Sequence, residues 1–331
     1  MSEPILDVVA IGNAIVDVIA AADDAFIAEH ALTKGGMQLI DAETADSLYS
    51  DMGAGREISG GSAANTLAGL AALGAKCGFI GQVFEDQLGT IFAHDIRTLG
   101  IRFETAMAKD GPPTARCLIL VTPDAQRTMN TFLGASQFLP AAALDLDMIR
   151  SARILYLEGY LWDPEQPRAA MRSAIAAARE AGREVAFTLS DAFVIERHRD
   201  DFLALIDEGM IDILFANETE IRSLAQTEDF EAAVARFADK LPTLVVTRSE
   251  KGAIAIRDGV RHQVAASPVE RVIDTTGAGD LFAAGFLAGH VRGKAPADCL
   301  ALGALAAAEV ISHYGARPEA DLKELAGNLL A

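Results

Sequence analysis

The sequence has few aromatic residues, few cysteines and few basic residues. Aromatics make up 6% of the 331 residues, so the hydrophobic content of 51% consists mostly of Ala, Leu, Ile and Val. This composition is typical of parallel strands covered by Ala-rich helices, because such strands are buried on both faces. A chain of this length is long enough for one large α/β domain or two smaller ones.

Basic residues are outnumbered by acidic ones. Lys and Arg total 28 against 47 Asp and Glu, which gives a formal net charge of −19. A chain this acidic repels a nucleic-acid backbone unless basic residues cluster, and no such cluster is visible. We therefore expect a small-molecule substrate and no nucleic-acid partner. The sequence leaves a monomer and a homodimer equally open.

The three cysteines, Cys77, Cys117 and Cys299, are far apart and form no CxxC pair. They lie in or beside apolar runs, which indicates reduced core thiols and a cytoplasmic protein. The N-terminal stretch "MSEPILDVVAIG" has neither the basic region nor the cleavage site of a signal peptide. The most apolar long stretch, residues 297–316, is interrupted by charged side chains and predicts a buried helix rather than a membrane span.

Several common catalytic motifs are missing. There is no G-x-x-x-x-G-K-[ST] phosphate loop, and only one glycine, Gly12, follows the first predicted strand where a dinucleotide fingerprint needs three. There is no G-x-S-x-G and no H-E-x-x-H, and the histidines form no spaced pair. These absences argue against Walker-type nucleotidases, NAD-dependent enzymes, serine hydrolases and zinc proteases.

From residue 153 onward, strand and helix patterns alternate regularly, and the pattern predicts a hairpin over residues 252–266. Alternating βα units predict an α/β fold with a doubly wound, mostly parallel sheet flanked by helices. Two helix-poor segments, 13–41 and 102–131, do not fit that arrangement. We assign them to a small β-rich lid over the carboxyl edge of the sheet, and residues 1–12, 42–101 and 132–331 to the main domain.

The stretch "DTTGAGD", residues 274–280, leads directly into an apolar helical pattern. Its glycines allow several backbone N–H groups to converge at a helix N-terminus, which is an anion site. Asp280 could cap that helix. Alternatively, it could take a proton from a hydroxyl that attacks a bound phosphoryl group. The heptapeptide alone does not decide between the two.

Two further motifs each have a structural and a functional interpretation. In "ISGGSAANTLAG", Gly60 and Gly61 precede a helix of small residues, and Asn65 could bind a sugar diol or merely pack. In "FANETEIRSL", Asn217 and Glu220 follow a strand. They could hold a hydrated Mg²⁺ at the carboxyl edge of the sheet, or simply cap the next helix.

Taken together and in this order, "GGSAANTLAGLAALG", "NETE" and "DTTGAGDLFAAGF" resemble the PfkB (ribokinase-like) family of carbohydrate and nucleoside kinases. The resemblance spans nearly the whole chain. It implies a ribokinase-like fold and ATP-dependent phosphorylation of a primary alcohol, with Mg²⁺ and sometimes K⁺. It also implies that Asp280 is the catalytic base, and that Gly277, Ala278 and Gly279 stabilise the transferring phosphoryl group.

The same resemblance implies a substrate site in which Asp17, within "GNAIVD", grips two sugar hydroxyls. Its other members would be Asn13, Gly36, Gly60, Gly61 and Asn65.

On the nucleotide side, the resemblance implies that Asn217 and Glu220 organise Mg²⁺ and phosphates, Glu220 through water, and that Arg127 reaches the phosphates from the lid. Many relatives have a glycine shortly after the threonine at the nucleotide cleft, whereas this chain has Arg248-Ser249. The remaining implied residues are Thr247, Gly252 and Ala307 for the nucleotide, and Asp274 and Thr276 for a monovalent cation.

The substrate remains open between two acceptors. "TKGGMQLID" and "GGSAANTLAG" look like the adenosine kinase branch, with Phe132 and Leu133 beside the base, which favours the 5′-hydroxyl of a nucleoside such as adenosine. Glu158 instead matches an acidic residue that sugar kinases of the ribokinase or fructokinase type use on a hydroxyl. A non-catalytic nucleoside-binding regulator is the alternative from another class.

Replacing Asp17 tests the implied substrate grip. We expect Asp17→Ala to raise the KM for the hydroxylated acceptor, because its diol loses a charged hydrogen-bond acceptor, while the affinity for ATP stays nearly unchanged. Steady-state kinetics with each substrate varied in turn measures both effects. Unchanged KM and kcat for the acceptor would contradict the assignment.

Overall fold

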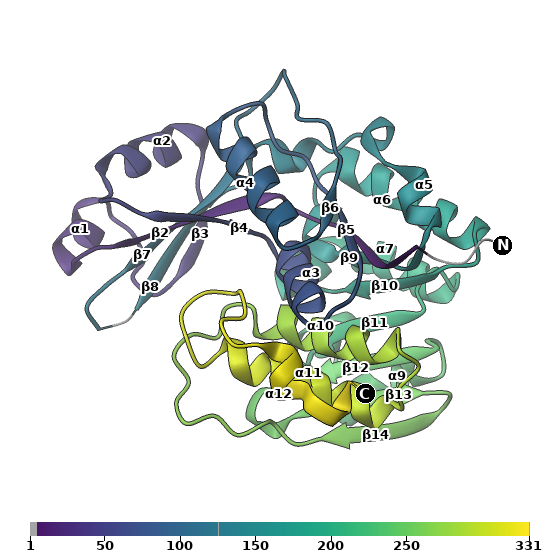
Figure 1. Ribbon diagram of the computed structural model, residues 1–331. Helices are drawn as coiled ribbons and strands as arrows, with labels where there is room; N and C mark the ends of the chain where they lie inside the picture. Colours follow the sequence, from purple (N-terminus) through teal and green to yellow (C-terminus); the bar gives the residue numbers. More distant parts are fainter. Residues whose placement is uncertain (1–4, 125, 331) are drawn as a thin grey trace.

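A computed structural model describes residues 5–124 and 126–330 of the chain. It contains a large sheet with helices on both faces and a smaller sheet that extends to the left in Figure 1. The strand order is β14-β13-β12-β11-β10-β9-β1-β5-β6 in the larger sheet and β3-β8-β7-β2-β4 in the smaller one.

The larger sheet is parallel from β6 to β12, and β13 pairs antiparallel with both β12 and β14. This arrangement confirms the predicted doubly wound, mostly parallel α/β fold. Its strands are β1 (Leu6–Ile11), β5 (Cys77–Ile80), β6 (Arg102–Phe103), β9 (Ala152–Glu158), β10 (Glu184–Thr188), β11 (Ile213–Asn217), β12 (Thr243–Thr247), β13 (Ala253–Arg257) and β14 (Val260–Val264).

Helices cover both faces of this sheet because its strands are apolar on both sides. In β9, Ile154 and Tyr156 pack into one core, whereas Leu155 and Leu157 pack into the other. The first face is covered by α3 (Ser62–Ala72), α4 (Gln87–Thr98), α10 (Ala278–His290), α11 (Pro296–Val310) and α12 (Leu322–Ala326). The second is covered by α5 (Leu146–Arg150), α6 (Glu165–Glu180), α7 (Ala192–Asp207), α8 (Glu218–Ala225) and α9 (Phe230–Ala238).

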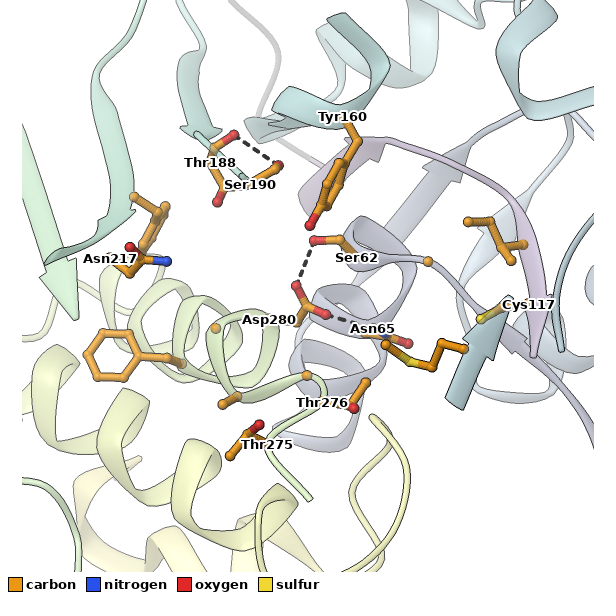
Figure 2. A pocket seen from close by; sticks show the side chains of 18 of the residues that line it. Ser62, Asn65, Cys117, Tyr160, Thr188, Ser190, Asn217, Thr275, Thr276 and Asp280 are labelled. Carbon is orange, nitrogen blue, oxygen red and sulfur yellow. Dashed lines mark hydrogen bonds between the residues drawn. The ribbon is translucent and has the colours of Figure 1, made fainter. Parts of the chain in front are cut away.

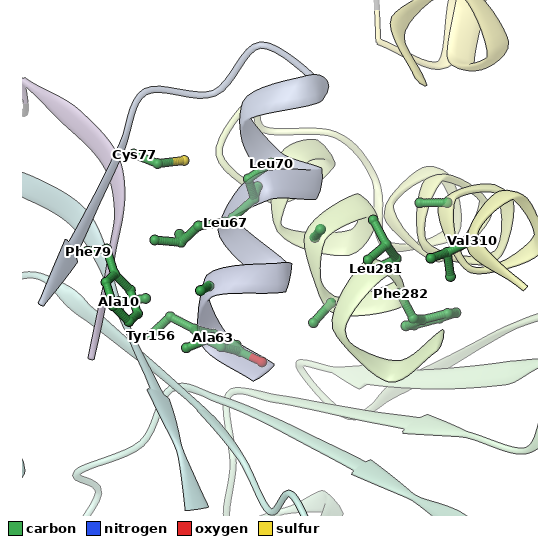
Figure 3. Close-up of a cluster of buried hydrophobic side chains, with 14 of the residues drawn as sticks. Ala10, Ala63, Leu67, Leu70, Cys77, Phe79, Tyr156, Leu281, Phe282 and Val310 are labelled. Carbon is green, nitrogen blue, oxygen red and sulfur yellow. The ribbon is translucent and has the colours of Figure 1, made fainter. Parts of the chain in front are cut away.

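Helix α10 lies close to both α3 and α11 (Figure 3), because glycines at the two contacts leave room for the facing helix. A Cβ added at Gly69 in α3 would lie 2.5 Å from Leu281 Cδ1 in α10. A Cβ at Gly285 in α10 would lie 2.3 Å from the carbonyl oxygen of Leu302 in α11. The Ala- and Gly-rich composition therefore supports close helix packing beside the start of α10.

The smaller sheet consists of β2 (Ile15–Ala21), β3 (Met37–Leu39), β4 (Arg56–Gly60), β7 (Ala115–Val121) and β8 (Arg127–Phe132). Its outer face is covered by α1 (Asp24–Glu29) and α2 (Ala42–Asp51), to which Ile27 and Leu48 belong. Val16 and Val18 of β2 are buried in the same core, whereas Asp17 between them faces the opposite way. The smaller sheet thus has one packed face and one face turned toward the main domain. The sheet with α1 and α2 is called the lid below, and the face toward the main domain is its inner face.

Two strands lie in a different sheet from the one expected. β4 belongs to the smaller sheet, although residues 42–101 were assigned to the main domain. Its sequence "REISG" lacks the alternating apolar pattern that identifies a strand. β6 belongs to the larger sheet, although the lid was expected to include residues 102–131. Phe103 in β6 is buried in the main core, and the two-residue strand continues the βα unit before the chain enters the lid.

Aspartate caps the N-terminus of α2 and of α4, and the thiols are buried as expected. Asp41 accepts a hydrogen bond from Thr44 N at the start of α2, and Asp86 accepts one from Gly89 N at the start of α4. The three cysteines are buried and unpaired. Within residues 5–124 and 126–330, none of the helices has the length and apolar character required to span a bilayer.

Gly61 joins β4 to α3 in a conformation that other residues rarely adopt. Its φ is +98°, and an added Cβ would lie 2.1 Å from the carbonyl oxygen of Asn13. We expect Gly61→Ala to lower the free energy of unfolding by about 2–4 kcal/mol, through backbone strain and steric overlap. Gly100→Ala is the matched control: its φ is +77° but no atom lies near the added Cβ. It should cost only about 1–2 kcal/mol. Equal losses in urea denaturation would contradict the predicted overlap.

Candidate active site

A cavity of about 380 Å³ lies where the carboxyl ends of β10, β11 and β12 meet the start of α10 and the inner face of the lid. Figure 2 shows that its side chains come from segments far apart in the sequence and point toward a common space. Residues that the sequence predicted for the site and that line this cavity are Asp17, Gly61, Asn65, Asn217, Glu220, Thr247, Thr276, Gly277, Ala278, Gly279 and Asp280.

The alternation of side chains along the lid strands determines what faces the cavity. In β8, Met129 and Thr131 line it, whereas Phe132 points to the other face and lies beside the Arg116 guanidinium. The expectation that Phe132 lines the substrate space is therefore wrong. In β7, Cys117 and Ile119 line the cavity by the same alternation. Together with Ile15 of β2, the inner face of the lid is mostly apolar.

Asp17 is the carboxylate on this inner face. Burial raises its pKa to about 6, Arg317 and Arg127 oppose the rise, and Asp280 adds to it. Gly60 leaves room for the Asp17 carboxylate, because a Cβ at residue 60 would lie 2.5 Å from Asp17 Oδ2. The implied role of Gly60 is thus to make room for Asp17 rather than to line the cavity.

Asp280 does not cap its helix. The N-cap of α10 is Gly277, which has φ +79° and makes no side-chain capping hydrogen bond. Asp280 lies in the first turn, where Ser62 Oγ donates to its Oδ1 at 2.6 Å and Asn65 Nδ2 donates to its Oδ2 at 3.2 Å (Figure 2). Burial raises the pKa of Asp280, and these two hydrogen bonds and Arg317 oppose the rise. A buried, oriented carboxylate with a raised pKa suits a proton acceptor.

The glycine turn before α10 also borders a second cavity of about 650 Å³. This cavity is mostly apolar, with Pro268, Val272 and Ala307 on its wall, and the predicted Thr247 and Gly252 line it too. The residues that border both cavities are Asn217, Thr247, Thr275, Ala278, Gly279 and Phe282. The N-terminus of α10 therefore separates the two spaces. The Ala278 N–H donates to Thr275 O at 3.2 Å, and the positive dipole and the other N–H groups of the first turn are available to an anion between the two spaces.

The unusual Arg248 does not obstruct the second cavity. Its guanidinium lies 3.9 Å from the centre of the Phe230 ring, and its Nε donates to Glu218 Oε2 at 2.8 Å. Ser249 and Glu250 line the cavity in its place. Ser249 has φ +51°, a conformation that glycine adopts more easily than serine.

Asn217 and Glu220 form a capping box at the start of α8, as their structural interpretation predicted. Asn217 N donates to Glu220 Oε2 at 2.9 Å, and Asn217 Nδ2 donates to Oε1 at 2.7 Å. Both residues also line the first cavity. Burial raises the pKa of Glu220 to about 7, against the hydrogen bond from Asn217. Asn217 and Glu220 can therefore cap α8 and also take part in the chemistry of the cavity.

Asp274 forms an ion pair with Arg127 of the lid. Both side chains of its ion pair with Arg127 are more than nine-tenths buried. Thr276 N and Oγ1 donate to Asp274 Oδ1 at 3.0 and 2.7 Å, and Gly315 N donates to Oδ2 at 2.9 Å. The positive charge beside the implied cation ligands Asp274 and Thr276 is thus the Arg127 guanidinium.

Five predicted substrate residues lie outside the cavity wall: Asn13, Gly36, Gly60, Phe132 and Glu158. Phe132 is described above, and Gly36 accepts a backbone hydrogen bond from Met129 in the turn before β3. Glu158 is fully buried, and burial raises its pKa to about 7. It accepts hydrogen bonds from Asn13 rather than facing the cavity.

The sequence interpretation missed several cavity residues. Tyr160 and Ser190 follow the carboxyl ends of β9 and β10, where ligands bind in open α/β sheets, so strand position could have identified them. Arg317 lines neither cavity, but its charge opposes the rise that burial causes in the pKa of Asp17 and of Asp280, and no motif identified it. It comes from the loop after α11, and its guanidinium donates to Ser59 O at 2.6 Å and to Ala64 O at 2.9 Å.

The family model described as pfkB family carbohydrate kinase matches residues 6–322. The chain belongs to this family. PfkB kinases are phosphotransferases that act on hydroxyl groups of small molecules, and the family implies ATP as co-substrate. Membership of this family favours an enzyme over the non-catalytic regulator. It also agrees with a carboxylate, Asp280, placed beside an anion site.

Solved structures similar to this PfkB kinase have two kinds of name. A probable sugar kinase from Rhizobium etli is 47% identical, with 98% of each chain covered and a TM-score of 0.90. An adenosine kinase from Sinorhizobium meliloti is 48% identical, with 97% of this chain and 98% of that chain covered and a TM-score of 0.89. Among curated proteins, a probable chloroplastic fructokinase-6 from Arabidopsis thaliana is 30% identical over 263 residues, which is 76% of this chain and 68% of that protein.

Substituting Asp280 separates base catalysis from a structural role. Asp280→Asn keeps the size of the side chain and an oxygen for the Ser62 hydroxyl, but it cannot take a proton. We expect kcat to fall by about 10² to 10⁴ while the KM for ATP stays similar. Steady-state kinetics gives both values, and a thermal melt checks folding. A folded variant with kcat near that of the wild type would show that Asp280 is not the base.

Proposed function

We propose that this kinase transfers the terminal phosphoryl group of ATP to the 5′-hydroxyl of a nucleoside such as adenosine. The observation that carries the proposal is the apolar inner face of the lid, where Ile15, Cys117, Ile119 and Met129 line the first cavity. Tyr160 faces the same cavity and offers an aromatic ring for stacking. A free sugar has polar groups all around its ring and would leave this apolar wall unused, whereas a base would bury it.

The polar end of the cavity suits a ribose. Asp17 and Asn65 line it from two sides, and Asn65 Oδ1 is buried without a hydrogen-bond partner although Asn65 Nδ2 is bound to Asp280. A hydroxyl of the acceptor would satisfy that oxygen. With the diol held by Asp17, the primary hydroxyl would point toward Asp280, which would accept its proton as the bond to phosphorus forms.

The nucleotide would occupy the second cavity, with its terminal phosphate at the start of α10. Gly277, Ala278 and Gly279 would stabilise the transferring group through backbone N–H groups and the helix dipole. Arg127 would leave Asp274 for the phosphates when both substrates are bound. A monovalent cation at Asp274 and Thr276 would occupy the position that the guanidinium then leaves.

Asn217 and Glu220 fit a hydrated Mg²⁺. The pKa of Glu220 is raised because the carboxyl is buried, and a nearby cation would favour its charged form. Mg²⁺ usually keeps several waters and is bound through one or two carboxylates together with substrate phosphates, so it would reach Glu220 through water. When bound, Mg²⁺ neutralises charge on the phosphate oxygens.

A sugar kinase of the fructokinase or ribokinase type is the second candidate, because relatives with such names are similar to this chain. The surroundings of Glu158 argue against a sugar kinase. Glu158, which would bind a sugar hydroxyl, has both oxygens engaged by backbone and side-chain N–H groups and lies outside the cavity wall.

The deciding experiment measures ADP release with adenosine, other nucleosides, ribose and fructose at saturating ATP. We expect kcat/KM for adenosine to exceed that for either sugar by at least about 10², because only the nucleoside buries the lid face. Ile119→Ala should lower kcat/KM for adenosine about tenfold and leave that for ribose nearly unchanged. Faster turnover of fructose or ribose would overturn the nucleoside assignment in favour of a sugar.

A further inference from the structure

Glu158 at the end of β9 is a fully buried carboxylate whose hydrogen bonds all come from N–H groups. Asn13 N and Asn13 Nδ2 each donate to its Oε1 at 2.7 Å, and Ala63 N donates to its Oε2 at 2.8 Å. No ion pair involving Glu158 occurs among residues 5–124 and 126–330. Three charge-assisted hydrogen bonds therefore compensate the burial of this carboxylate.

Its partners lie where the chain passes between the main domain and the lid. Asn13 joins β1 to β2, and Ala63 follows Gly61, which joins β4 to α3. The two connections are in contact, because a Cβ at Gly12 would lie 2.5 Å from Ala63 Cβ and 2.6 Å from Glu158 Oε2. Glu158 thus holds both connections from one point of the main sheet.

The bond to Ala63 also completes the start of α3. Gly61 is the N-cap of this helix and provides no side-chain capping hydrogen bond. The Glu158 carboxylate accepts a first-turn N–H and places negative charge at the positive end of the helix. The same first turn carries Ser62 and Asn65, which orient the Asp280 carboxylate.

We propose that Glu158 is a positioning residue for phosphoryl transfer: it fixes the start of α3 and the first lid connection relative to each other. Through α3 it sets the two donors that hold Asp280, and through Asn13 it sets β2, which carries Asp17. This role differs from a contact with a substrate hydroxyl, and it applies to whichever acceptor the kinase uses. It therefore does not depend on the nucleoside assignment.

The test is Glu158→Gln, assayed with the best acceptor found in the ADP-release panel. A glutamine has one acceptor oxygen for three N–H donors, so its amide group must face either Ala63 N or the Asn13 donors. We expect kcat to fall about 10- to 100-fold because Asp280 loses its orientation, while the KM for ATP stays within about twofold. The loss should be the same for the acceptor and for its deoxy analogues.

Asp86→Asn is the matched control. Asp86 also caps a helix and accepts three donors from two elements, namely Gly89 N, Thr114 N and Thr114 Oγ1, but it lies outside both cavity walls. We expect it to lower the melting temperature and leave kcat unchanged. A role of Glu158 in stability alone would make the two variants behave alike.

Two results would overturn the proposal. One is a folded Glu158→Gln variant with wild-type kcat. The other is a loss that disappears for one deoxy analogue, which would mean that Glu158 binds that hydroxyl directly. If Glu158→Gln does not fold, Glu158→Asp provides the same test, because its shorter carboxylate keeps the charge but cannot reach Asn13 and Ala63 together.

Discussion

The start of α10 has no side-chain cap, and the arrangement of the site depends on how the fold supports that open end. A helix end without a cap costs stability, because its first N–H groups lack partners. Here the helix is held by close packing against α3 and α11, which glycine and alanine at the contacts allow. Packing rather than capping fixes its position, so its N–H groups remain directed at the boundary of the two cavities.

The lid contributes through the two faces of its sheet. Alternate residues of β2, β7 and β8 either pack under α1 and α2 or face the cavity. Each strand therefore holds the lid together with one set of side chains and faces the cavity with the other. Arg127 lies on the inward set and binds Asp274 of the glycine turn, so lid and turn are connected before any ligand enters.

Much of the fold was predictable because it follows from local patterns. Apolar strands, Ala-rich helices and the caps at Asp41 and Asp86 each depend on neighbours in the sequence. β4 could not be recognised in this way, since its pairing with β2 stabilises a strand that lacks an apolar pattern. For the same reason its place in the lid became clear only from the sheet.

In the site too, local motifs identify some residues, whereas the contacts between distant segments follow only from the fold. That Asp17, Asn65 and Asp280 line one cavity was predictable from motifs. That Ser62 and Asn65 orient Asp280 was not, because they precede it by more than two hundred residues. The side of the lid on which Phe132 lies depends on strand register, which its local sequence does not show. Glu158 matched a family position, yet its surroundings, rather than its identity, determine what it binds.

The two cavities share a wall, and this has a thermodynamic consequence. The residues that line both cavities include Ala278, Gly279, Asn217 and Thr247. A ligand that shifts or stiffens these residues from one side changes the free energy of binding on the other side. Such coupling is reciprocal, so whatever factor the nucleotide applies to the affinity for the acceptor, the acceptor applies to the affinity for the nucleotide. Two ligands that occupied the two cavities at once would therefore be coupled through this shared wall.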